Sequence, residues 1–102
     1  VVIARNDFIE AHPDAVETFL QQYEASVNYV NDNVADAAVL VGNYDIVAAQ
    51  VAEKAIPECN ITFIAGNDMK EKLSSYLGIL FEQNPAAVGG ALPNDDFYYN
   101  AD

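Results

Sequence analysis

The longest regular pattern in the sequence is an apolar stripe at helical spacing in its first third. Apolar side chains recur every three or four positions, and polar side chains occupy most positions between them. Pro13 suits the first position of a helix, and the polar run Asn31–Asn33 interrupts the pattern. The stripe consists of Val16, Phe19, Leu20, Tyr23, Val27 and Val30. This pattern predicts a helix that begins at Pro13 and packs one face against a core.

Shorter helices are predicted on both sides of this stripe. Asn6 or Asp7 can cap a helical turn through Phe8 and Ile9. After Asn33, a helix is expected over residues 34–41, with Gly42 at its end. Residues 43–45 should then start a third helix, which Pro57 stops. The apolar positions expected on that third helix are Ile46, Val47, Val51 and Ala55.

A last long helix is predicted near residues 68–83. Asp68 and Glu71 have the spacing of a capping box, in which two side chains satisfy the free N–H groups at a helix start. The apolar stripe of this helix is Met69, Leu73, Tyr76, Leu77 and Leu80. Asn84–Pro85 should restart one helical turn, and Gly89–Gly90 should end it.

Two short runs rich in β-branched residues predict strands. Val1–Ala4 is apolar throughout, and Ile61–Ile64 lies between Pro57 and the turn that begins at Gly66. The two runs could pair with each other. The chain as a whole is therefore expected to be a mainly helical α/β unit with about four or five helices and two or three short strands, forming one domain over residues 1–102.

The charge balance restricts the partners. The chain has 16 acidic residues against 4 lysines and arginines, for a formal net charge of -12. Such a surface repels the phosphate backbone of nucleic acid and anionic lipid alike. Solubility is the simplest role for the charge, and no nucleic-acid partner is expected.

The side chains needed for nucleophilic catalysis are scarce. His12 is the single histidine and lies at a predicted helix start, which is typical of a surface or capping residue. Cys59 is the single cysteine, so no internal disulfide can form, and it is expected to be a small buried apolar residue. We therefore predict that the chain is not an enzyme and has no catalytic residues.

No motif for a metal or a cofactor is complete in the sequence. Asn31, Asn33 and Asp36 resemble the start of a calcium loop, but the rest of the EF-hand pattern fails, and helix capping explains them. Asp95 and Asp96 lie in a turn, where acids are usually solvated. Gly89–Gly90 is too short to hold a phosphate, and no lysine or arginine follows it. No metal and no cofactor are expected.

Two stretches carry a family resemblance. Residues 1–16 join the first predicted strand to the helix start at His12–Pro13, and they resemble nitrate, sulfonate and taurine type substrate-binding proteins of ABC importers. The more specific stretch is similar to the end of a Firmicute branch of these proteins. It includes Ile56–Ile61, Gly66, Met69–Lys70, Tyr76–Leu77, Leu80, Asn84–Pro85, Gly89–Gly90, Leu92–Pro93 and Phe97–Tyr99.

The resemblance implies a fold, a function and a location. Family members have two α/β lobes that close over a solute, and this chain would form about the last third, as the C-terminal part of one lobe of a type II periplasmic-binding-protein fold. It implies a solute-binding component, extracytoplasmic and often lipid-anchored, that delivers a small organic solute to an ABC permease. No ligand-contacting motif of the family maps onto a position here, so the ligand-binding residues stay unknown. Gly89–Gly90 and Phe97–Tyr99 are family-like, and structural roles in a turn and in docking onto the lobe are expected for them.

Two further expectations follow. The alternative to transport is a free-standing acidic helical module that binds a protein partner through an apolar groove. We also expect this chain to form a homodimer, because the strand Val1–Ala4 and the aromatic run Phe97–Tyr99 both favour pairing with another copy.

Overall fold

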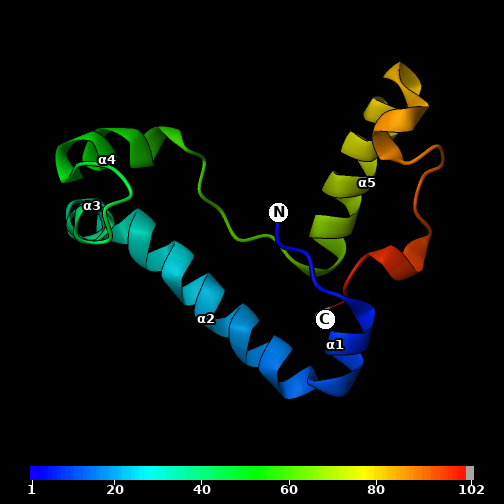
Figure 1. The fold of residues 1–102 in the computed structure, drawn as a ribbon, viewed down its shortest axis with the longest axis horizontal. Coiled ribbons are helices and arrows are strands. Elements are labelled where there is room, and N and C mark those ends of the chain that lie inside the picture. The colour runs from blue at the N-terminus through cyan, green and yellow to red at the C-terminus, as the bar shows by residue number, and fades with distance from the viewer. Residues whose placement is uncertain (101–102) are drawn as a thin grey trace. The chain divides into compact units, whose positions relative to one another are not determined.

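The computed structural model describes residues 1–100 and is mainly helical, as the sequence predicts (Figure 1). Within these residues it has five α-helices and three short 3-10 helices, and it contains no β-strand. The α-helices are α1 (Asn6–Ala11), α2 (Pro13–Asp32), α3 (Val34–Asn43), α4 (Ala49–Ala55) and α5 (Gly66–Gln83). The 3-10 helices are η1 (Ile56–Glu58), η2 (Pro85–Val88) and η3 (Asp95–Phe97).

The chain divides into two compact units. The first unit is Val1–Phe63 and contains α1 to α4 with η1, and the second is Ile64–Asp102 and contains α5, η2 and η3. The single domain expected over residues 1–102 stays a prediction.

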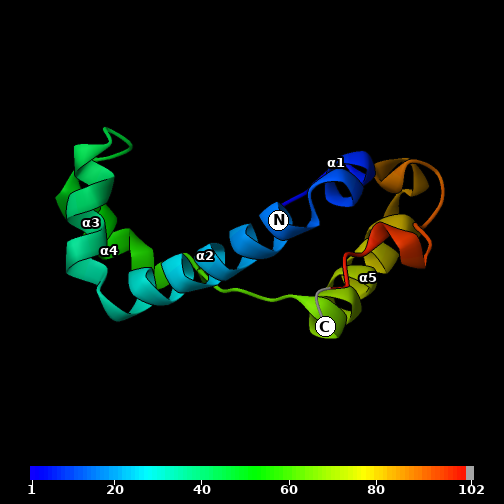
Figure 2. The ribbon, with the colours of Figure 1, turned by 90° about the horizontal axis from the view of Figure 1, so that it is seen from below.

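The core of the first unit lies where α3 and α4 pack against each other (Figure 2). Its buried side chains are small, apart from one isoleucine: Ala37, Ala38, Ala52 and Ile56. Val30 from the end of α2 packs against this cluster, as do Val34, Val41 and Ile61. A Cβ atom built on Gly42 would lie 3.2 Å from the Cβ of Ala49, so glycine permits the close approach of the two helices.

The ends of α2 and α3 refine the sequence prediction. α2 begins at Pro13 and runs to Asp32, and the Asn33 side chain donates to the Tyr29 carbonyl at 3.2 Å, which caps the end of α2 and not the start of α3. α3 continues past Gly42 to Asn43.

The predicted third helix is wrong in its first turns. Asp45 has a φ of 56°, in the left-handed region, so residues 44–48 form a turn and α4 starts only at Ala49. Ile46 and Val47 therefore lie outside the helix that was expected to carry them, and both are exposed.

Both predicted strands are absent from the described residues. Val1–Ala4 has no regular structure and is exposed, and Ile61–Ile64 runs as an extended segment without a ladder (Figure 1). A strand requires a neighbouring strand to receive its backbone hydrogen bonds, and these two runs do not pair with each other. The β-propensity of these two runs is therefore not enough to form a β-strand when no neighbouring strand is present.

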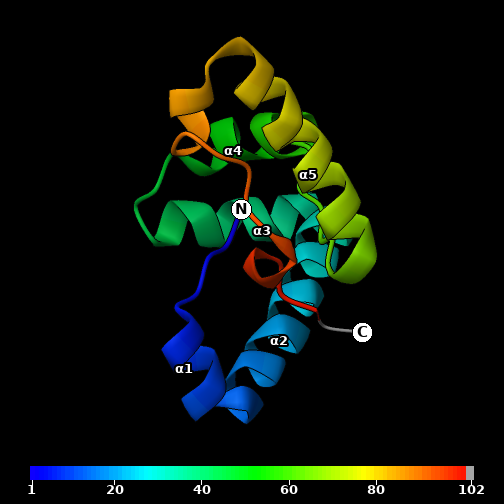
Figure 3. The same cartoon turned by 90° about the vertical axis from the view of Figure 1, so that its right-hand side faces the viewer.

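The second unit is built around α5. This helix begins at Gly66, two residues before Asp68, so Asp68 lies in its first turn and the expected capping box does not form. The segment after α5 folds back toward the start of that helix (Figures 1 and 3). As predicted, a helical turn restarts at Asn84–Pro85 and ends at Gly89, which has a φ of 78°. The Asn84 side chain caps this turn by accepting the Ala86 N–H at 3.2 Å.

Candidate functional site

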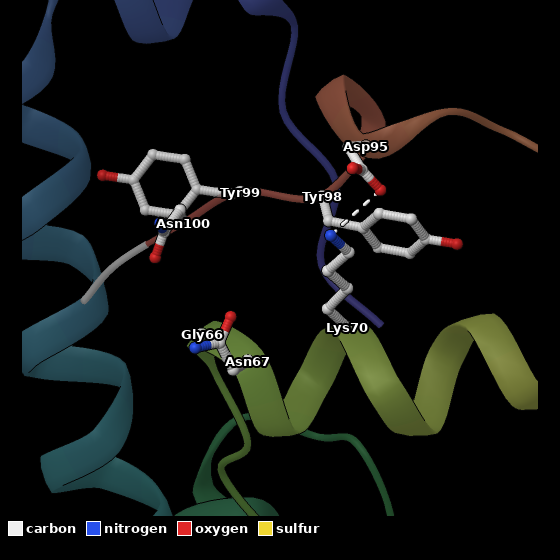
Figure 4. A pocket seen from close by; sticks show the side chains of 7 residues that line it. All are labelled: Gly66, Asn67, Lys70, Asp95, Tyr98, Tyr99 and Asn100. Carbon is white, nitrogen blue, oxygen red and sulfur yellow. Dashed lines mark ion pairs between the residues drawn. The ribbon is translucent and has the colours of Figure 1, made fainter.

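The clearest concave site lies in the second unit, at the amino end of α5 (Figure 4). It is a pocket of about 190 Å³. Its lining comes from the first turns of α5, from η3 and from the segment that follows η3: Gly66, Asn67, Lys70, Asp95, Tyr98, Tyr99 and Asn100. Residues 66–70 and residues 95–100 therefore meet at one end of a helix.

The start of α5 gives the pocket its floor. Gly66 is buried and has a φ of 62°, a conformation that a residue with a Cβ adopts at a cost, so glycine suits the turn into the helix. Ala65, the N-cap residue of this helix, makes no side-chain cap hydrogen bond. The N–H groups of a first helical turn carry a partial positive charge, and this end of a helix therefore favours polar groups that are negative or that accept hydrogen bonds.

An ion pair joins the two sides of the pocket. The Lys70 ammonium lies 2.9 Å from an Asp95 carboxylate oxygen, as the dashed line in Figure 4 marks. Asn94 holds the backbone beside Asp95 by accepting the Asp96 N–H at 3.1 Å. The pair is open to solvent, with the side chains of Lys70 and Asp95 40% and 88% exposed. An ion pair this exposed contributes little to stability.

Aromatic rings complete the wall. Tyr98 is half-buried, and the Phe97 ring stands edge-on to it with the ring centroids 5.2 Å apart. In Figure 4 the side chains of Tyr99 and Asn100 lie together, on the other side of the pocket from the Tyr98 ring. Of the run Phe97–Tyr99, only Tyr98 is half-buried, and Phe97 and Tyr99 are exposed; docking of this run onto a lobe stays a prediction.

The lining determines what the pocket can do chemically. It offers amides, phenols, one ammonium group and one carboxylate, which together suit the hydrogen bonding of a small polar molecule. None of its lining residues is a serine, cysteine or histidine, and its two charged side chains, Lys70 and Asp95, pair with each other.

A second depression lies on α4 in the first unit. Gln50, Val51, Lys54 and Ala55 line it, all on the one helix, and it is wide open to solvent. A surface supplied by a single helix does not enclose a small molecule, so we give it no binding role.

The structure places the two residues weighed for catalysis on the surface. His12 lies between α1 and α2 with its ring centroid 5.0 Å from that of Phe8, consistent with the expected surface residue. Cys59 was expected to be buried and is exposed instead. The reason is local: Cys59 follows η1 at its C-terminal end, where the chain leaves the core at Ile56.

Three of the polar residues weighed for metal binding have partners within the protein. The Asn31 amide donates to the Ile61 carbonyl at 2.9 Å, and the Asn33 amide donates to the Tyr29 carbonyl. Asp95 pairs with Lys70. Within residues 1–100, no three histidine, cysteine or acidic side chains gather as a metal site would require.

Sequence reasoning did not find the pocket. Lys70 and Asp95 carry no motif, and their separation in the sequence gives no sign that they pair. The available signal was Gly66 directly before a predicted helix, together with an Asn–Asp turn and aromatic residues after it. These features indicated turns and docking, but not that both turns meet at one helix end.

Comparisons with models of protein families, with curated proteins and with solved structures find no match to this chain. Within the part that the structure describes, none of the helices combines the length and the apolar character needed to cross a membrane.

Proposed function

We propose that this chain belongs to the solute-binding component of an ABC-type importer, which captures a small organic solute outside the cytoplasmic membrane and delivers it to the permease. In this proposal the chain is the C-terminal part of one lobe of a type II periplasmic-binding-protein fold. The proposal rests on the sequence resemblance and, first among the structural observations, on one extended segment.

That observation is an apolar extended segment laid along a helix. Ile61 packs against the core of the first unit, its carbonyl accepts the Asn31 amide of α2, and the Phe63 ring lies 5.8 Å from the Tyr23 ring of α2. Thr62, between them, is exposed. Alternate side chains thus face the helix and the opposite side, as in a strand of an α/β layer whose sheet is incomplete.

The remaining apolar surface supports the same proposal. In a protein lobe with a central sheet, helices bury one face against strands. Here Phe19 of α2 and Tyr76 and Ile79 of α5 are exposed, and the strand-like run Val1–Ala4 lies uncovered. Further strands and helices of the same lobe would bury these side chains.

The pocket at the amino end of α5 supports a solute-binding role. Two-lobed binding proteins hold their solute in the cleft between the lobes and gain affinity by burying most of its surface on closure. A pocket of about 190 Å³ with a helix amino end, Lys70 and two tyrosines could form part of one wall of such a cleft. A single wall leaves the solute largely exposed, so the chain by itself should bind solutes weakly.

An acidic helical interaction module is the second candidate. The observation that favours it is the set of exposed apolar side chains around α3 and α4, which includes Val39, Leu40, Tyr44 and Val51. A module would use these side chains to contact its partner, whereas a transport protein would cover them with the rest of the lobe.

The reading frame that encodes the chain distinguishes the two candidates. For transport we expect a frame of roughly 300 residues with a lipoprotein signal, since two lobes of the usual domain size are needed, beside permease and ATPase genes. A complete gene of about the present length with no export signal would overturn transport in favour of the module.

Solute binding gives a direct test. The full protein should be stabilised against heat by its solute in a screen of sulfonates, amines and pyrimidines, because a ligand that binds only the folded state raises the unfolding temperature. By calorimetry, the present chain should show no micromolar binding to any of them. Micromolar binding by this chain would contradict the proposal that a second lobe is needed to enclose the solute.

A further inference from the structure

We draw no further inference here: the strongest candidate, the pocket at the amino end of α5, belongs to the site already described, and its two charged side chains, Lys70 and Asp95, pair with each other.

Discussion

The two units of this chain are stabilised in different ways. In the first unit, α3 and α4 bury small side chains against each other, and every buried apolar side chain of the described core belongs to this unit. In the second unit, one 18-residue helix buries only Gly66. The first unit therefore depends on tertiary packing, while the second depends on helix propensity, caps and partial burial.

The small size of the core residues explains much of the exposed apolar surface. Alanines at the contact between α3 and α4 let the helices approach closely, but each alanine buries little area. The larger apolar side chains, such as Tyr44 and Val51, remain outside this contact and are exposed. The difference between the units can be tested by changes that act on packing in one unit and on local helix stability in the other.

The largest effect is expected from Ala52→Asp. Ala52 of α4 is 3% exposed, and burying a carboxylate there without a partner should cost about 3 kcal/mol or more. A small unit has only a few kcal/mol of stability, so its cooperative thermal transition should disappear. The matched control Ala55→Asp, at an exposed position of the same helix, should melt close to the parent. Equal melting of both variants would show that α4 is not packed as described.

Gly42→Val should destabilise the first unit by about 1–3 kcal/mol, as overpacking generally does. The Cβ atom alone would come within 3.2 Å of both the Cβ and the backbone nitrogen of Ala49, and valine adds two methyl groups beyond it. Denaturant titration followed by circular dichroism measures the change. An unchanged midpoint would mean that α3 and α4 do not touch at Gly42.

Gly78→Ala should stabilise the second unit by about 0.5–1 kcal/mol, because alanine is the better helix former. Gly78 lies within α5, and a Cβ there would meet nothing within 4 Å. Gly89→Ala is the matched contrast: it has equally open space but a φ of 78°, so the same substitution should destabilise. Hydrogen exchange of the amides in α5 and η2 measures both changes. Faster exchange in Gly78→Ala than in the parent would show that residue 78 does not lie in an unobstructed helix.

The smallest effect is expected from Lys70→Met. This substitution breaks the exposed pair with Asp95, which should cost less than about 1 kcal/mol and should fade with added salt. Hydrogen exchange near Tyr98 should increase more in this variant than in Lys72→Met, the control on the same helix. Equal exchange rates near Tyr98 in the two variants would show that the Lys70–Asp95 pair does not hold the segment after η3 against α5.

Helix positions could be predicted largely from the sequence, because they depend on local periodicity and caps. Pro13 starts α2, Asn84 caps η2 and Gly89 ends it, and each of these roles is set by the residue's own backbone preferences. Boundaries failed where two local signals competed. Asp68 has the spacing of a capping box, yet the chain turns at Gly66, and α5 starts there instead.

Only the tertiary structure decided which apolar residues are covered and which residues meet. A β-strand forms only beside another strand that receives its hydrogen bonds. The β-branched runs Val1–Ala4 and Ile61–Ile64 therefore favour an extended backbone, but neither has a neighbouring strand among the described residues. The contact at Gly42, the exposure of Cys59 and the meeting of Lys70 with Asp95 likewise depend on how distant segments approach each other. Periodicity along the chain determines helices because their hydrogen bonds are local, whereas cores, sheets and pockets are formed by residues that the sequence holds far apart.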